Sequence, residues 1–408
     1  MGKFIVSGGK PLFGEVEVSG SKNAALPIIF ASLITHGVSE IHNLPEITDV
    51  MLALEIIEGF GAKITKHDGT VYIDTRELAY YLPAEDKVSR LRASTYLIGA
   101  GLGRFGRAEL QSFGGCNFSR RPIDMHICAA EKFGAYADGK TLVADKMRSS
   151  DIFFEKKSVG ATVNALIMAA SVKGNSRIYG YAEEPHVIAL IDYLKSAGAA
   201  IYKSNGAICI SGGDLHGGKI SVPGDMIEAG TFLAASLITG GRVTVRGLEI
   251  SELDSFLSPL VTAGVELKSS RVMAELCGHP REAMSIVTSA YPGFPTDLQP
   301  IFSVIMARFM GGNIRETVWP GRFGYISELK KLGVIADTDS EMVRISPSKI
   351  KCGTMNATDL RGGAAGILAA LSADGRSEIL SGEMVLRGYE RFDKKLRNLG
   401  AEIFYMRK

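Results

Sequence analysis

Cationic side chains gather in a few short, glycine-containing segments of this 408-residue chain. Each lies close to a stretch with helical spacing, and together they contain Lys22, Arg121, Arg322, Arg361 and Arg387. A cation opposes the positive N-terminal end of a helix dipole, so helix capping does not explain these residues. Arginine binds carboxylate and phosphate groups with two parallel hydrogen bonds. The pattern therefore predicts a site for an anion that carries more than one negative group.

Two acids and one thiol lie in the same kind of segment. Asp297 and Asp359 each begin a helical stretch, where an aspartate can cap the helix by accepting backbone N–H bonds. Capping and a role in the anion site both remain open for these acids. Cys116 lies in a Gly-Gly-Cys loop beside Arg120 and Arg121. A thiol near cations ionises more easily, so Cys116 is a candidate acid or nucleophile.

Other motifs carry less weight. The segment Gly101-Leu-Gly-Arg-Phe-Gly106 has the GxGxxG spacing of dinucleotide-binding loops. That fingerprint needs a strand before it and a helix after it, and here the expected order is reversed. The seven histidines show no metal-ligand spacing, so no metal site is expected. Lys156, Lys157 and Ser158 precede a helical stretch and could hold phosphates, which is a weak signal in isolation.

An internal repeat organises the whole chain. Six times a helical segment ends in a glycine and runs at once into a strand-like segment. Glycine suits the left-handed turn that ends such a helix. Between these stretches a second, small and apolar helix is expected six times. The six glycines are Gly61, Gly134, Gly198, Gly264, Gly333 and Gly400, and the second helices are expected at 23–34, 92–102, 163–170, 228–238, 297–310 and 359–371.

Two of the second helices nearly duplicate each other. Ala31-Ser-Leu-Ile-Thr-His-Gly37 matches Ala235-Ser-Leu-Ile-Thr-Gly-Gly241 at all but one position, half a chain apart. The simplest explanation is two domains of three α+β units each, related by a pseudo-twofold axis. The units are longer than the 20–50 residues usual for solenoid repeats. Ligands often bind between domains, so the glycine-rich loops are candidates to line a cleft.

The amino-acid composition argues against some classes of function and some cellular locations. The formal charge is only +2, from 46 basic and 44 acidic residues, which argues against a nucleic-acid or membrane binder. No segment reads as a signal peptide, and no run approaches the roughly 18 apolar residues of a spanning helix. Five cysteines, none in a CxxC pair, fit free thiols in a reducing compartment. A cytoplasmic location is therefore expected.

At these residues the chain resembles the UDP-N-acetylglucosamine enolpyruvyl transferase (1-carboxyvinyltransferase) family. The resemblance runs over essentially the whole chain, through SGSKNAALP from Ser19, LRAS, GGC followed by RRPIDMH, SVGATV, PTD, ETVW followed by RF, ATDLR and RGYER. It implies a two-domain inside-out α/β (α+β) barrel in which each domain has three βαβαββ repeats. The implied domain boundaries are 22–223, and 1–21 with 224–408. The implied reaction is the first committed step of bacterial peptidoglycan precursor synthesis.

The resemblance also implies residue roles. Lys22, Arg121 and Arg387 would hold the phosphate of phosphoenolpyruvate, and Arg322 and Arg361 its carboxylate. Cys116 would be the general acid and Asp297 would help to deprotonate the sugar 3′-hydroxyl. No metal or organic cofactor, nucleic acid, membrane or obligate protein partner is implied. The remaining implied substrate contacts are Asn23, Arg92, Pro122, Ile123, Asp124, Met125, Lys156, Lys157, Ser158, Val159 and Val318.

Three positions depart from the family pattern. The family commonly has lysine where this chain has Thr48, an acid where it has His186, and arginine where it has Met226. These positions belong to the acceptor side and the hinge, whereas the phosphoenolpyruvate set is intact. Two alternatives therefore stay open: a paralogue that acts on another nucleotide sugar, and a non-catalytic regulatory paralogue that binds a UDP-sugar. The shikimate-pathway sister enzyme is disfavoured by the GGC loop and by SKNAALP.

Overall fold

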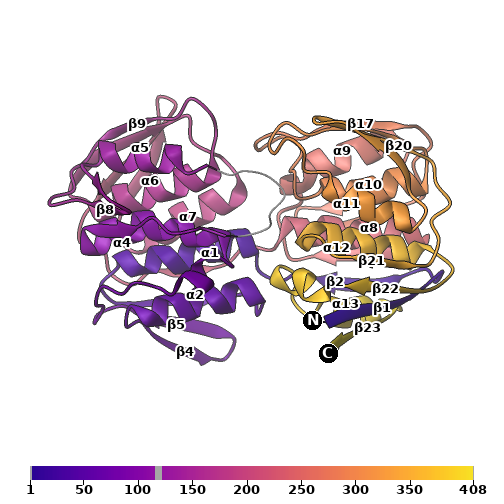
Figure 1. Cartoon of the computed structure of the whole chain (residues 1–408), viewed down its shortest axis with the longest axis horizontal. Coiled ribbons are helices and arrows are strands. Elements are labelled where there is room, and N and C mark those ends of the chain that lie inside the picture. The colour runs from indigo at the N-terminus through magenta and orange to yellow at the C-terminus, as the bar shows by residue number, and fades with distance from the viewer. Residues whose placement is uncertain (1, 115–121, 408) are drawn as a thin grey trace. The chain divides into compact units, whose positions relative to one another are not determined.

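The computed structural model of the chain describes residues 2–114 and 122–407. Two compact units are present (Figure 1): residues 2–19 and 224–407 form one, and residues 20–114 and 122–223 form the other. We call the first the terminal unit and the second the middle unit.

The middle unit alternates helices with short strands. Its helices are α1 (Lys22–Ala31), η1 (Ser32–Ile34), α2 (Thr48–Gly59), α3 (Glu85–Val88), η2 (Arg92–Tyr96), α4 (Leu97–Phe105), α5 (Asp124–Lys132), α6 (Val159–Ser171) and α7 (Pro185–Ser196). Its strands are β3 (Val38–His42), β4 (Lys63–His67), β5 (Thr70–Asp74), β6 (Arg107–Glu109), β7 (Tyr136–Asp138), β8 (Thr141–Val143), β9 (Asp151–Phe153), β10 (Gly174–Tyr179), β11 (Ala200–Ser204), β12 (Ala207–Gly212) and β13 (Lys219–Ser221).

The terminal unit follows the same alternation. Its helices are α8 (Met226–Thr239), η3 (Ile250–Leu253), α9 (Asp254–Thr262), α10 (Gln299–Arg308), α11 (Gly324–Lys331), α12 (Leu360–Ser372), η4 (Gly382–Arg387) and α13 (Phe392–Asn398). Its strands are β1 (Gly2–Gly8), β2 (Phe13–Glu17), β14 (Arg242–Arg246), β15 (Glu266–Ser270), β16 (Met273–Cys277), β17 (Met284–Val287), β18 (Gly312–Arg315), β19 (Ile335–Thr338), β20 (Met342–Ser346), β21 (Thr354–Asn356), β22 (Gly375–Leu380) and β23 (Glu402–Arg407).

One four-stranded sheet pattern recurs in both units. In the order β9, β10, β12, β11 the first pair is parallel and the next two pairs are antiparallel. The sheet β17, β18, β20, β19 repeats this pattern. Some sheets take a strand from a distant part of the chain: β13 pairs with β3, and β2 pairs with β14. The repeat predicted from the sequence is thus confirmed as a structural repeat.

The six predicted helix-ending glycines all have the left-handed backbone that the sequence pattern requires. Their φ angles lie between 86° and 110°, from Gly333 to Gly198, and each follows a helix and precedes a strand. A side chain at φ values of this kind is strained, which explains why glycine recurs. The repeat is therefore fixed by local backbone chemistry as well as by the hydrophobic pattern.

The second helix of each repeat forms the interior. In α8 and α12 nearly every residue is buried, and α10 is buried around its whole circumference. In the middle unit, α1 and α6 are equally apolar and buried. A helix that is hydrophobic on all sides must lie inside a core. The sheets instead alternate buried and exposed residues, as in β12, so that helices lie inside and sheets outside, as expected.

The GxGxxG segment is not a dinucleotide loop. Gly101 and Gly103 lie within α4, Gly106 ends that helix with a φ of 68°, and β6 follows. Replacing Gly101 by a larger residue would bring a Cβ within 2.6 Å of the Arg107 carbonyl oxygen. These glycines therefore serve close packing and helix termination. Among the helices formed by residues 2–114 and 122–407, none is long and apolar enough to cross a membrane.

A buried ion pair links distant segments inside the terminal unit. The carboxylate of Glu228, in α8, accepts from Lys395 Nζ at 2.6 Å and from the Ser19 backbone N–H at 3.0 Å. Lys395 Nζ also donates to Ser19 Oγ at 2.7 Å. Glu228 is 1% exposed. Ser19, at the end of the N-terminal segment, is thus bound by Glu228 of α8 and Lys395 of α13.

Candidate active site

Two arginines flank one aspartate in the terminal unit. Arg322 Nη1 lies 2.9 Å from Asp297 Oδ1, and Arg361 Nε and Nη2 lie 3.2 and 3.1 Å from Asp297 Oδ2. Asp297 comes from the loop between β17 and α10, Arg322 from the loop before α11, and Arg361 from the first turn of α12. The arginine side chains are 5% and 2% exposed, whereas that of Asp297 is 27% exposed. The three predicted residues therefore form one cluster, with the carboxylate on its accessible side.

Of the two acids considered as helix caps, only Asp359 is one. Its Oδ1 accepts from the backbone N–H groups of Arg361 and Gly362 at 2.9 and 3.0 Å. Capping by Asp297 is wrong: α10 begins after Leu298 and has no side-chain cap. The Asp297 carboxylate is turned to the two buried guanidinium groups instead. Capping by Asp359 fixes the helix end that carries Arg361.

A second layer behind Arg361 was not predicted from the sequence. The Arg361 guanidinium carbon lies 5.2 Å from the centre of the Tyr389 ring, which is a cation–π contact. That hydroxyl lies 2.9 Å from Thr231 Oγ1, which donates to the Ile227 carbonyl at 2.7 Å. Tyr389 therefore donates its hydroxyl proton to Thr231, while its ring faces the Arg361 guanidinium.

The electrostatics keep Arg361 charged. Burial by itself lowers the pKa of Arg361, but the neighbouring Tyr389 and Asp297 outweigh it, and the pKa is raised overall. Burial also raises the pKa of Tyr389, which keeps the phenol neutral and able to donate. A permanent cation at a dry position suits the binding of an anion.

Replacing Tyr389 with phenylalanine is expected to lower the free energy of unfolding by about 1–2 kcal/mol, because the buried Thr231 hydroxyl loses its hydrogen-bond donor. Denaturant unfolding measures the loss. Tyr202→Phe is the matched control, since Tyr202 is 61% exposed. Equal stability of the two variants would contradict the proposed chain of hydrogen bonds.

The predicted phosphate ligands are described in part. Lys22 is the first residue of α1, and its Nζ lies 3.5 Å from Oδ2 of the buried Asp49. Asn23 follows it in the same helix. Arg387 ends η4 in the terminal unit and is half-buried. Arg121 and Cys116 lie outside the described residues.

The predicted nucleotide-sugar contacts gather around the N-terminal ends of α5 and α6. Ile123 precedes α5, and Asp124 and Met125 begin it; Ser158 caps α6, accepting from the Ala161 N–H at 3.4 Å, and Val159 begins it. The two ends are close, because a Cβ on Gly160 would meet His126 Nε2 at 2.6 Å. Burial, with a smaller contribution from Arg92, lowers the pKa of His126 to about 4, so this histidine is neutral.

Five further predicted contacts have simple placements. Arg92 begins η2, and burial lowers its pKa. Pro122 and Lys156 are exposed. Lys157 forms an ion pair with Glu183 at 2.5 Å. In the terminal unit, the Val318 backbone N–H donates to Glu316 Oε1 at 2.8 Å. The structure thus brings Arg322, Arg361 and Asp297 together in the terminal unit, and it places most of the predicted nucleotide-sugar contacts near the starts of α5 and α6 in the middle unit.

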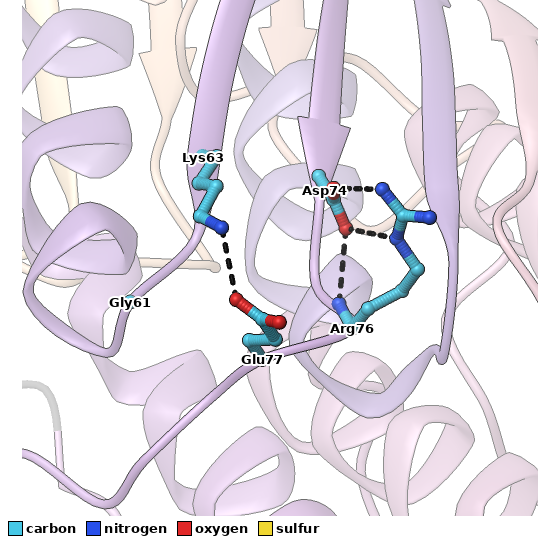
Figure 2. Close-up of a pocket in the computed structure, with 5 residues that line it drawn as sticks. All are labelled: Gly61, Lys63, Asp74, Arg76 and Glu77. Atoms are coloured by element: carbon cyan, nitrogen blue, oxygen red, sulfur yellow. Dashed lines mark hydrogen bonds and ion pairs between the residues drawn. The ribbon is translucent and has the colours of Figure 1, made fainter.

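A surface cavity lies away from all these residues. It has a volume of about 230 Å³ and is lined by Gly61, Lys63, Asp74, Arg76 and Glu77. Figure 2 shows its charges already paired: Lys63 bonds to Glu77 at 2.9 Å, and Arg76 to Asp74 at 2.6 Å. Hydrogen bonds from Arg76 lower the pKa of Asp74 to about 2. Because these charges satisfy one another, the cavity offers little to a ligand. Within residues 2–114 and 122–407 no group of three or more His, Cys, Asp or Glu side chains could hold a metal ion.

Comparisons with known proteins agree with this geometry. The sequence matches the EPSP synthase (3-phosphoshikimate 1-carboxyvinyltransferase) family over residues 6–396. It is 39% identical to UDP-N-acetylglucosamine 1-carboxyvinyltransferase 3 of Caldanaerobacter subterraneus over all of both chains. It is 38% identical to UDP-N-acetylglucosamine 1-carboxyvinyltransferase of Clostridium botulinum over 99% of each. Its fold is similar to that of the enolpyruvyl transferase NikO of Streptomyces tendae, with a TM-score of 0.89, 24% identity and 99% of each chain covered.

Proposed function

Because the chain belongs to the EPSP synthase family of carboxyvinyltransferases, we propose that it transfers the enolpyruvyl group of phosphoenolpyruvate to the 3′-hydroxyl of UDP-N-acetylglucosamine and releases phosphate. The acceptor is taken from the relatives at 38–39% identity, which bear that substrate in their names. The observation that carries the proposal is the Asp297 carboxylate held between two buried arginines.

The residues divide the chemistry as follows. Arg322 and Arg361 bind the carboxylate of phosphoenolpyruvate, and Lys22, Arg121 and Arg387 bind its phosphate. Asp297 takes the proton of the 3′-hydroxyl as the oxygen attacks C2, and Cys116 delivers a proton to C3. The resulting tetrahedral adduct keeps both anionic groups, so the same cations hold it throughout. Loss of a proton from C3 and of phosphate from C2 then restores the vinyl group on the sugar.

Most of the acceptor contacts come from the middle unit in this proposal. The segment from Pro122 to Met125 and the segment from Lys156 to Val159 contact the nucleotide sugar, and Asn23 and Arg92 contact substrate. Asp297 and Val318 contact the sugar ring. The N-terminal ends of α5 and α6 suit a diphosphate, because backbone N–H groups and the helix dipole favour anions there. The pathway step is peptidoglycan precursor synthesis, in the cytoplasm, with no obligate protein partner.

Phosphate release tests the proposal. Purified protein is incubated with phosphoenolpyruvate and UDP-N-acetylglucosamine, other nucleotide sugars, or shikimate 3-phosphate. We expect phosphate with UDP-N-acetylglucosamine alone. Release only with a different nucleotide sugar would keep the donor chemistry and change the acceptor.

A specific observation supports the alternative acceptor. Thr48, His186 and Met226, the three departures from the family pattern, lie at or next to the first residue of α2, α7 and α8. Changes at helix N-terminal ends alter how an anion is received there. Binding of the UDP-sugar without phosphate release would instead support the regulatory paralogue.

The acid role of Cys116 has its own test. Cys116→Asp is expected to retain turnover, since a carboxyl group can also donate a proton, and to lose alkylation at this position by thiol reagents. Phosphate release and mass spectrometry measure the two properties. A folded but inactive Cys116→Asp protein would contradict the acid role.

A further inference from the structure

Glu316 is buried beside the candidate site and has four hydrogen-bond donors around its carboxylate. It lies just after β18, is 1% exposed, and belongs to the ETVW segment, to which the sequence assigns no role. Its Oε1 accepts from the backbone N–H groups of Val318 and Trp319, both at 2.8 Å. Its Oε2 accepts from Thr296 Oγ1 at 2.8 Å and from Gln299 Nε2 at 3.3 Å.

These four donors come from the two chain segments that carry Asp297 and Arg322. Thr296 and Gln299 flank the Asp297 loop, while Val318 and Trp319 belong to the loop that leads to Arg322. A buried carboxylate with satisfied oxygens is held rigidly, because removal of any partner leaves a buried polar group unpaired. Glu316 therefore joins the two loops at a fixed spacing.

The hydroxyl of Thr296 connects Glu316 to Arg322 through two hydrogen bonds. A hydroxyl has one proton to donate, and the acceptor-only carboxylate of Glu316 takes it. The lone pairs of Thr296 Oγ1 then face Arg322 Nη1, which donates to them at 2.9 Å. The same Nη1 donates to Asp297 Oδ1 at 2.9 Å. The direction of the Thr296 hydrogen bond thus decides whether Thr296 can accept from Arg322 alongside Asp297.

We propose that Glu316 is a positioning residue: it orients the Thr296 hydroxyl as an acceptor for Arg322 and so sets the guanidinium beside Asp297. It touches neither substrate, and it acts through Thr296 and Arg322. This inference rests on the proposed function, in which Arg322 binds the carboxylate of phosphoenolpyruvate. It predicts an effect concentrated on that substrate.

Glu316→Gln keeps the size and removes one acceptor. The new NH₂ group faces Thr296, so the hydroxyl no longer has a carboxylate to donate to and turns away from Arg322. We expect the KM for phosphoenolpyruvate to rise about tenfold, the value of one charge-assisted hydrogen bond, with a smaller change in the KM of the acceptor. Thr296→Val is expected to have the same effect, and Thr296→Ser to recover most of the loss.

A double variant distinguishes a positioning role of Glu316 from general destabilisation of the fold. If both residues act through one hydrogen bond, the double variant Glu316→Gln/Thr296→Val raises the KM no further than either single variant. Glu275→Gln is the matched control, because Glu275 also accepts from a threonine, Thr244 at 3.2 Å, on strands β14 and β16 of a different sheet from β17 and β18. Its KM for phosphoenolpyruvate should equal that of the unaltered protein.

The outcomes are distinguishable from failure of the proposed function. Absence of phosphate release by the unaltered protein concerns the function. An unchanged KM in Glu316→Gln, or fully additive effects in the double variant, overturns the inference. A crystal structure of Glu316→Gln gives a readout without turnover. Separation of Arg322 Nη1 from Thr296 Oγ1 beyond hydrogen-bond distance supports the inference, and retention of that bond overturns it.

Discussion

Replacing Asp297 with asparagine is expected to lower turnover by about 10²- to 10⁴-fold, the range for removal of a general base, while phosphoenolpyruvate binding is retained. Asparagine has nearly the same shape but no basic carboxylate to take the 3′-hydroxyl proton. Both guanidinium groups remain, so the donor keeps its carboxylate ligands. The measurement is steady-state phosphate release with each substrate varied in turn. Turnover equal to that of the unaltered protein would contradict the base role.

The same variant has a second expected property. The Arg322 and Arg361 guanidinium groups each face one oxygen of Asp297, and an amide can replace only one of those oxygens. One buried cation therefore loses an acceptor oxygen, which the carboxylate of phosphoenolpyruvate would replace. Phosphoenolpyruvate should accordingly raise the melting temperature of Asp297→Asn more than that of the unaltered protein. Asp337→Asn, on the exposed side of β19, is the control for both measurements.

Local signals were enough to predict the repeat and its polar loops. The positive φ at Gly61 or Gly400 can be predicted from one residue, because glycine itself occupies the position. The buried helices α8 and α12 can be predicted from runs of about a dozen apolar and small residues. Such features can be read from spacing and residue type alone, and the fold follows from repeating them.

Hydrogen bonds between residues far apart in the chain could not be predicted in this way from the sequence. Glu316 and Tyr389 lie in segments whose motifs were recognised, yet their partners are set by the packing of separate elements. Tyr389 meets Thr231 across 158 residues of sequence. The role of Asp297 could not be predicted from its local sequence either. Its position before a helix suggested a cap, whereas its carboxylate binds two arginines from distant parts of the chain. Only the folded geometry decides between these uses of one side chain.

The buried pair of Glu228 and Lys395 gives the largest expected effect on stability. Lys395→Met is expected to lower the free energy of unfolding at pH 8 by about 3–5 kcal/mol, because it leaves a buried carboxylate without its cation. Lys173→Met is the matched control. Its partner Asp214 lies 2.9 Å away, but both side chains are exposed, so the expected loss is below about 1 kcal/mol.

The loss should depend on pH in a definite direction. Burial raises the pKa of Glu228 to about 7 although Lys395 opposes the shift, and removal of Lys395 raises it further. A carboxyl group with a raised pKa in the folded state favours its protonated form there. Its contribution to stability is therefore present below the unfolded pKa near 4.5 and is lost as pH rises through 7. Denaturant unfolding of Lys395→Met should show a smaller deficit at pH 5 than at pH 8. Addition of Glu228→Gln should restore much of the stability at pH 8, since no buried charge then remains. An equal deficit at both pH values would indicate that Lys395 stabilises the unit through its packing and not through its charge.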